Sequence, residues 1–165
     1  MTAIRRARFS DLEFITELEA REDMAAYILR WKRSRHHVNL ADEDKRYLIL
    51  EDQQARRRGF AVLSGITDEH GVVELTRIIV DQPGQGLGRR FLRAIKEFVF
   101  AELSAHRLWV DVFSDNERAQ HVYRSEGFVE EGRLRDAVRD GATRRSLIVM
   151  SMLAHEYGCR EASGF

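Results

Sequence analysis

Cysteine is nearly absent from this chain of 165 residues. Cys159 is the single one, so no internal disulfide bond can form. A cytoplasmic, reducing compartment is therefore the simplest expectation. Metal-binding patterns are also missing, because Cys159 and the nearby His155 are too few ligands for a zinc site. The pair His36-His37 lacks the His-Glu-x-x-His spacing of zinc proteases, and we expect no metal centre.

An excess of one sign of charge is missing as well, since 27 basic and 27 acidic residues give a formal net charge of zero. Proteins that bind nucleic acids through bulk charge normally have a basic excess, so we expect no nucleic-acid partner. The short run Arg56-Arg57-Arg58 is interpreted as a solvated entry to a strand. No apolar run approaches the roughly 18 to 20 residues that span a bilayer, and no apolar signal-peptide segment follows the N-terminal arginines. We expect no membrane partner.

Apolar residues make up 44% of the chain, which is enough for a packed core, and its length fits one domain. Short apolar or alternating runs bounded by turn residues predict strands. Asp140-Gly141 between the last two strands is a strong hairpin signal. The predicted strands are Ile4–Phe9, Tyr47–Leu50, Phe60–Ile66, Val72–Val80, Leu108–Phe113, Phe128–Val138 and Thr143–Leu153.

Apolar positions three or four residues apart predict helices between these strands. Ser10 and Glu13 have capping-box spacing, and Gly127 is a typical helix end. The predicted helices start near Asp11, cover Asp23–Arg33, run from Leu87 to Leu103, and start again at the N-cap candidates Asp115 and Asn116. Residues 35–40 are interpreted as a loop and 154–165 as a loose tail. The order predicts a mixed α/β sheet in one domain, residues 1–153.

A glycine-bearing segment joins the longest predicted strand to the clearest helix. The first N–H groups of a helix have no internal partner, and glycines let a phosphate approach them closely. Gly84, Gly86 and Gly88 alternate here, and Arg89 adds a positive charge. The segment lacks the Gly-Lys-Ser/Thr ending of a P-loop, and it does not have the third glycine of the dinucleotide fingerprint at the right spacing. Taken alone, it indicates either a phosphate-binding turn or a tight turn without a ligand.

Two spaced motifs carry a family resemblance. The first is Pro83-Gly84-Gln85-Gly86-Leu87-Gly88, and the second is Asn116-Glu117-Arg118-Ala119, followed by Tyr123 and then by Gly127-Phe128. Over about residues 3–153 the chain resembles the GNAT N-acyltransferases, whose signature is Arg/Gln-x-x-Gly-x-Gly/Ala. Pro83 stands where the family has Arg or Gln. The segment Glu131–Asp136 and the ending Ile148–Leu153 look like the branch of ribosomal-protein N-terminal and polyamine acetyltransferases, although Ser146 replaces an Asp that is common there.

The resemblance implies a central, mostly antiparallel sheet of about six to seven strands flanked by about four helices. It also implies acetyl-CoA as the cosubstrate and a possible homodimer. The pantetheine arm would pair with Ile78, Ile79 and Val80, where a backbone N–H near Ile79 or Val80 would hold the oxyanion. Asn116 would reach the pantetheine or the strand edge. The pyrophosphate would be held at Gly84, Gln85, Gly86, Leu87, Gly88 and Arg89.

Acetyl transfer to an amine needs a base for the ammonium and an acid for the departing thiolate. The resemblance makes Glu74 the candidate base and Tyr123 the candidate acid. The alternatives are that Glu74 pairs with Arg77 or a neighbouring strand, and that Tyr123 is an aromatic residue at the edge of the core. Residues 24–37 and 133–143 would wall the acceptor site, as they do in the family.

The predicted function is an N-acetyltransferase that moves the acetyl group of acetyl-CoA to a primary amine by direct attack. The acceptor would be a small molecule or a peptide N-terminus, which fold alone does not specify. A second hypothesis is a CoA-binding module of the same fold that senses or scaffolds and catalyses nothing.

Overall fold

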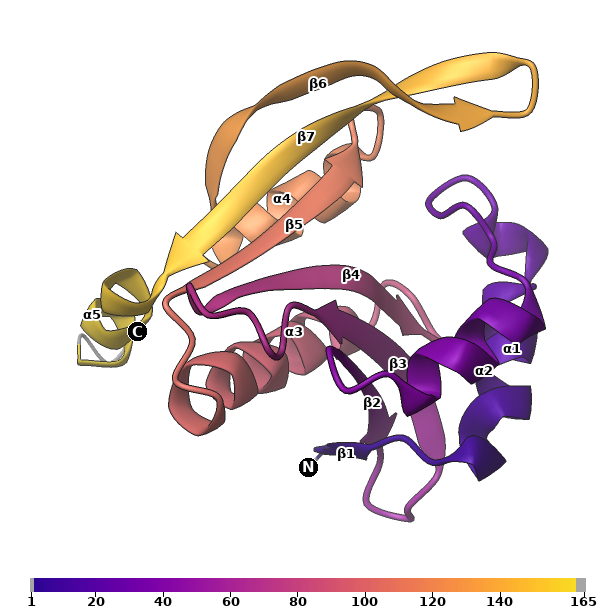
Figure 1. Ribbon diagram of the computed structural model, residues 1–165, viewed down its shortest axis with the longest axis horizontal. Coiled ribbons are helices and arrows are strands. Elements are labelled where there is room, and N and C mark those ends of the chain that lie inside the picture. The colour runs from indigo at the N-terminus through magenta and orange to yellow at the C-terminus, as the bar shows by residue number, and fades with distance from the viewer. Residues whose placement is uncertain (1, 163–165) are drawn as a thin grey trace.

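The computed structural model describes residues 2–162, with side chains described up to residue 158. Seven strands form one sheet in the order β1-β2-β3-β4-β5-β7-β6 (Figure 1). Neighbouring strands are antiparallel, except that β4 and β5 are parallel. The strands are β1 (Ala3–Arg6), β2 (Lys45–Glu51), β3 (Arg57–Ser64), β4 (Val72–Val80), β5 (Arg107–Phe113), β6 (Val129–Asp140) and β7 (Thr143–Leu153). The mixed, mostly antiparallel sheet predicted from the sequence is confirmed.

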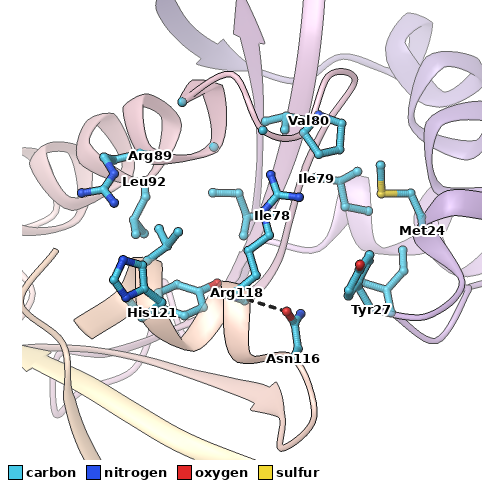
Figure 2. A pocket seen from close by; sticks show the side chains of 18 residues that line it. Met24, Tyr27, Ile78, Ile79, Val80, Arg89, Leu92, Asn116, Arg118 and His121 are labelled. Carbon is cyan, nitrogen blue, oxygen red and sulfur yellow. Dashed lines mark hydrogen bonds between the residues drawn. The ribbon is translucent and has the colours of Figure 1, made fainter. Parts of the chain in front are cut away.

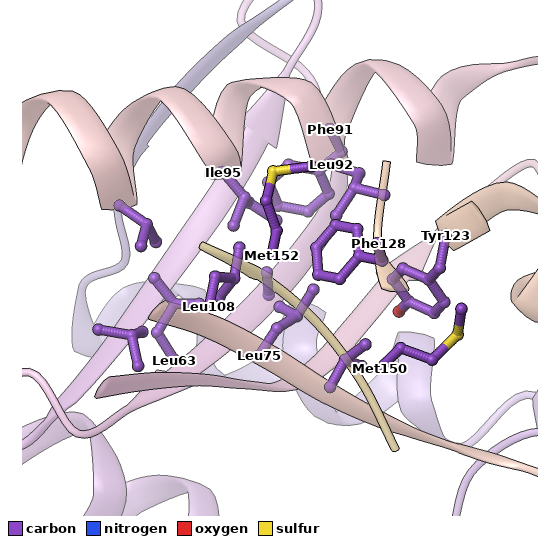
Figure 3. Close-up of a cluster of buried hydrophobic side chains, with 14 of the residues drawn as sticks. Leu63, Leu75, Phe91, Leu92, Ile95, Leu108, Tyr123, Phe128, Met150 and Met152 are labelled. Atoms are coloured by element: carbon purple, nitrogen blue, oxygen red, sulfur yellow. The ribbon is translucent and has the colours of Figure 1, made fainter. Parts of the chain in front are cut away.

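Helices cover both faces of this sheet. On one face α1 (Leu12–Glu19) and α2 (Arg33–Ala41) lie over β2, β3 and β4. On the other, the apolar side of α3 (Leu87–Glu97) packs Phe91, Leu92 and Ile95 into the larger core cluster (Figure 3). A π-helical turn, Phe98–Glu102, continues α3, and α4 (Glu117–Ser125) follows β5. No helix of the described chain is long and apolar enough to cross a membrane.

The two parallel strands separate partway along their length. β4 pairs with β5 only from Val72–Arg107 to Glu74–Trp109, although both strands continue beyond these residues (Figure 1). A bulge at Thr76 accompanies the separation, because Leu63 pairs with Leu75 whereas Val62 already pairs with Arg77. A bulge bends a strand and increases its twist. The edge of β4 beyond Glu74 is therefore free to pair with a ligand.

The predicted second helix is wrong in its position. A 3-10 turn forms at Glu22–Met24, residues 25–32 are not helical, and a helix, α2, forms where a loop was predicted. Side chains satisfy the backbone of the non-helical segment: Arg145 donates to the Ala26 carbonyl at 2.9 Å, and the Glu19 carboxylate accepts from the Trp31 N–H at 2.9 Å. The apolar spacing of this segment fits a helix, but tertiary hydrogen bonds decide the backbone.

The sequence of α2 has few apolar residues at helical spacing, and the residue that holds the helix to the core is the polar His36. His36 is fully buried, with Nε2 at 2.8 Å from Glu19 Oε2 and Nδ1 at 3.0 Å from the Tyr47 hydroxyl. Apolar periodicity could not reveal such an anchor.

The two ends of the described chain also differ from expectation. Ser10 makes no capping bond. Instead, a 3-10 turn, Phe9–Asp11, precedes α1, and the Asp11 carboxylate accepts from the Arg8 N–H at 2.8 Å. The expected loose tail forms α5 (Ala154–Ala162), in which Tyr157 stacks on Phe100 with ring centroids 5.1 Å apart. The last three residues of the predicted tail lie outside the described residues.

Candidate active site

Two cavities lie side by side where β4 and β5 separate. Their volumes are about 470 Å³ and about 410 Å³. The first reaches the glycine segment and α3, and the second reaches the side chains of Glu74, Trp31 and Asp111. Six residues line both cavities: Tyr27, Ile28, Ile78, Asn116, Ala119 and Tyr123. The arrangement suits two substrates that meet at one point.

The first cavity ends at the N-terminus of α3, where the backbone conformation needs glycine. Gly84 and Gly86 have φ angles of 93° and 75°, which side chains other than glycine rarely adopt. Gly86 is the N-cap residue, and a Cβ built on it or on Gly88 would meet no atom within 4 Å. The N–H groups at a helix start, the helix dipole and the open space together suit an anion. Figure 2 shows β4 and α3 around this cavity.

Arg58 holds the segment in front of the glycines. Its Nε donates to Asp81 Oδ2 at 2.8 Å, and its Nη2 donates to Gln82 Oε1 at 2.8 Å. Backbone bonding adds to this, because the Asp81 N–H donates to the Arg58 carbonyl at 2.8 Å. The prediction that residues 56–58 are merely solvated is therefore wrong for Arg58, which fixes the start of the turn.

Most of the residues predicted to bind the cosubstrate line the first cavity. They are Ile78, Ile79, Val80, Gly84, Gly86, Gly88, Arg89, Asn116 and Tyr123. Gln85 and Leu87 do not line it: Gln85 is exposed, and Leu87 is buried in the core beside Phe91. The side chain of Arg89 lines the cavity but also forms an ion pair with Glu126 at 3.2 Å. Its positive charge is therefore shared between that carboxylate and the cavity.

Asn116 and Tyr123 come from α4, which the second motif encodes. Asn116 is the N-cap, and its Oδ1 accepts from the Ala119 N–H at 3.1 Å (Figure 2). This bond uses Oδ1 of Asn116, so that the Nδ2 amide group can donate to another partner. Tyr123 is only 6% exposed and packs edge-on against Phe128 with centroids 5.4 Å apart (Figure 3). Burial raises the pKa of the Tyr123 phenol, and the charge of Asp111 raises it further, so the hydroxyl is protonated at neutral pH.

Glu74 lines the second cavity together with Tyr123. Burial raises the pKa of its carboxyl, the nearby Asp111 raises it further, and Lys45 opposes both effects. The alternative that Glu74 pairs with Arg77 is wrong, because Arg77 instead forms an ion pair with Glu19 at 2.8 Å. Within the described chain Glu74 makes no side-chain hydrogen bond or ion pair. A carboxylate with a raised pKa in a cavity suits a general base.

The segment between α1 and α2 covers the second cavity. Trp31 lies between two guanidinium groups, since Arg35 and Arg77 are each 3.8 Å from its ring centroid. Arg77 also donates to the carbonyl of Leu29. The segment 24–37 therefore walls the candidate acceptor site as expected, whereas of the expected 133–143 only Val138 lines this cavity.

Sequence reasoning missed several residues that line the two cavities. Arg118 and His121 of α4 line the first (Figure 2), and a Cβ on Gly84 would lie 3.4 Å from an Arg118 guanidinium nitrogen. Arg118 stands at an unspecified position of the second motif, so the motif does not point to it. Its positive charge was the only feature that could have indicated a role in binding phosphate. Asp111 of β5 was also missed, although a single acid within the apolar run from Leu108 to Phe113 is itself a signal.

Comparison with known proteins places this site in a family. Residues 7–128 match the acetyltransferase (GNAT) family. A curated relative is the spermidine N(1)-acetyltransferase of Vibrio cholerae, which is 27% identical over 139 residues, covering 79% of this chain and 80% of the relative. A crystal structure of the Vibrio cholerae spermidine N-acetyltransferase with CoA and spermine superposes with a TM-score of 0.85 at 24% identity, covering 94% and 97% of the two chains. A dodecameric structure from the same organism has a TM-score of 0.82 at 24% identity, covering 96% and 97%.

A helix N-terminus that suits an anion, joined to a cavity that holds a buried tyrosine and a carboxylate, is an arrangement that suits a group-transfer enzyme. The match over most of the chain makes the class specific: the protein belongs to the GNAT family and is an acetyl-CoA-dependent acetyltransferase.

Proposed function

We propose that the protein transfers the acetyl group of acetyl-CoA to a primary amine of a polyamine such as spermidine. The observation that carries this proposal is the meeting of the two cavities at Tyr123, one ending at a helix N-terminus and the other holding unpaired carboxylates. The first suits the phosphates of the cosubstrate, and the second suits a cationic amine. The similarity to spermidine N(1)-acetyltransferases supports the same acceptor class.

The residues of the first cavity fit acetyl-CoA. Pro83 has no N–H to donate, so the phosphate cradle comes from the residues that follow it. Gly86 and Gly88 leave room for phosphate oxygens, and Arg89 and Arg118 supply positive charge. The free edge of β4, residues 78–80, pairs with the pantetheine arm as an added strand would, and directs the thioester toward Tyr123.

The chemistry then uses one base and one acid. The ammonium of the acceptor passes a proton to Glu74, and the neutral amine attacks the thioester carbonyl. A backbone N–H near Ile79 or Val80 stabilises the oxyanion. As the new C–N bond forms and the C–S bond breaks, Tyr123 donates its proton to the thiolate and recovers one from the amide nitrogen. Glu74 releases its proton to solvent, and the overall reaction yields one amide, one thiol and one proton.

A CoA-binding module without catalysis is the second candidate function, because Pro83 and Ser146 depart from the family pattern. Turnover separates the two candidates. Release of free CoA with spermidine, spermine or another amine supports the enzyme, whereas binding of acetyl-CoA without turnover of any amine supports the module.

The cosubstrate site is tested by the melting temperature with and without acetyl-CoA. Ligand at about 100 times its dissociation constant adds roughly 2.7 kcal/mol, which raises the melting temperature by several degrees. Gly86→Val should abolish the shift, since a side chain at φ 75° is strained and projects into the cavity.

Gly141→Val is the matched control. Gly141 has a φ of 59° in the β6–β7 turn, with open space around its Cβ position, far along the chain from the cavity. The control should lower the melting temperature of the free protein but keep the shift. An unchanged shift in Gly86→Val would place the cosubstrate elsewhere.

A further inference from the structure

Two carboxylates in the second cavity have no partner of their own. Glu74 and Asp111 both line it, and neither forms a hydrogen bond or ion pair with any residue that the structure describes. Their neighbours on each strand fix which way they face. Val73 and Leu75 flank Glu74, and Val110 and Val112 flank Asp111, and all four pack in the core cluster under α3. Because side chains alternate along a strand, both carboxylates project from the opposite face of the sheet.

Asp111 lies at the place where β5 loses its partner. The pairing of β4 with β5 ends at Glu74 and Trp109, so Asp111 is two residues beyond the last paired position. On its other side β5 remains paired with β7, where Asp111 is opposite Val149. Asp111 therefore lies on the part of β5 that no longer pairs with β4, and its side chain lines the cavity between the two strands.

A third polar group points to a ligand at the same place. Tyr123 lines this cavity, is 94% buried and has no hydrogen-bond partner for its hydroxyl among the described residues. The positive groups of the cavity are engaged elsewhere: Arg35 and Arg77 stack on Trp31, and Arg77 also pairs with Glu19. Two unpaired carboxylates and a free hydroxyl match an ammonium ion, which has three donors and no acceptor.

We propose that Asp111 is a second acceptor-binding carboxylate, which holds the reacting ammonium group of the polyamine jointly with Glu74. This inference rests on the proposed function. With two carboxylates, the two tasks are divided: Asp111 retains the ammonium group while Glu74 accepts its proton. A lone carboxylate would have to do both. The negative charge of Asp111 also raises the pKa of Glu74, which keeps that carboxyl an effective base.

Asp111→Asn tests the proposal, because it keeps the shape and removes the charge. We expect KM for spermidine to rise at least about tenfold, as for a lost hydrogen bond to a charged group, with KM for acetyl-CoA unchanged. The acid limb of kcat/KM should move to lower pH, because Glu74 loses a like-charged neighbour. The charged groups that remain in the cavity or act on Glu74, namely Arg35, Arg77 and Lys45, are not substituted. The Tyr123 phenol, whose pKa Asp111 also raises, stays protonated over the acid limb.

Asp111→Glu keeps the charge and should restore most of the affinity for spermidine. Glu130→Gln, which removes an exposed carboxylate of β6, is the control and should change neither KM nor the pH profile. Should Asp111→Asn fail to fold, Asp111→Ser takes its place in the same assay. If the wild type acetylates no amine, the proposed function is at fault. If the wild type is active and the Asp111 variants keep both its KM for spermidine and its acid limb, the inference about Asp111 alone is wrong.

Discussion

At the scale of single residues, the site departs from the rule that buried charge is paired. Glu74 and Asp111 have no ion-pair partner among the residues that the structure describes, while Arg77, on the same strand as Glu74, is paired with Glu19. An unpaired, partly buried carboxylate destabilises the folded state when it is charged. Such groups are retained where they act on a substrate, and stability is expected to improve when they are removed.

The stability of Asp111→Asn should therefore depend on pH in a definite direction. Burial raises the pKa of Asp111 in the folded protein above its unfolded value of about 3.9. Below the unfolded value the group is protonated in both states and costs nothing, and above the folded value the full penalty applies. The variant should melt higher than the wild type at pH 7, and the difference should vanish as the pH falls toward about 3.5. Differential scanning calorimetry between about pH 3.5 and pH 7 measures this difference in melting temperature. If Asp111→Asn is less stable than the wild type at pH 7, Asp111 is not an unpaired carboxylate in the folded protein.

At the scale of secondary-structure elements, the sequence predicts the strands well and the segment around the acceptor site poorly. Strand β4 is recognisable from Val72-Val73 and Ile78-Ile79-Val80, because its apolar residues pack on both faces of the sheet. The glycine turn and the Asn116 cap are equally local, since each depends on a backbone conformation or a bond within three residues.

The segment 23–41 could not be predicted in this way. Its backbone is held by Glu19, Arg77 and Arg145, which are distant in the sequence, and its helix is anchored through a buried histidine. Asp111 was missed for a related reason: its importance comes from the separation of β4 and β5, which appears only when the strands are paired.

Glu19 should be the residue on which this segment depends most. Its carboxylate accepts from the Trp31 N–H, lies 2.8 Å from His36 Nε2 and forms an ion pair with Arg77, and both side chains of the Glu19–Arg77 pair are at most 6% exposed. Glu19→Gln leaves a buried guanidinium without a counter-ion, for which we expect a loss of about 3–5 kcal/mol in the free energy of unfolding. Chemical denaturation measures the loss.

The exposed ion pair between Arg124 and Glu130 provides a comparison, because both side chains are more than 40% exposed. Glu130→Gln should cost no more than about 1 kcal/mol. Equal losses in the two variants would contradict the anchoring role assigned to Glu19.

At the scale of the whole molecule, the sheet ends in a long strand that exposes apolar side chains among charged ones. β6 is the last strand of the sheet, its residues are almost all exposed, and Val129 and Leu134 expose 53% and 48% of their surface. The β6–β7 hairpin extends from the body of the molecule (Figure 1). Exposed apolar side chains on an edge strand can pack against another chain.

Self-association is therefore expected, as a dimer or a larger assembly. Light scattering after size exclusion should give a mass that is a multiple of 19.2 kDa. Arg substitutions at Val129 and Leu134 should lower that mass, and a wild type of 19.2 kDa at all concentrations would exclude assembly through this edge.

We propose that one buried tyrosine, Tyr123, completes acetyl transfer to a polyamine at the junction of the two cavities. The most direct test is the rate of CoA release from acetyl-CoA with spermidine, measured for the wild type and for Tyr123→Phe. We predict acetylated spermidine as the product, and a loss in kcat of about 10²- to 10⁴-fold in the variant, with its acetyl-CoA-induced melting shift retained. Equal rates in the two proteins, or no product from the wild type, would contradict the account.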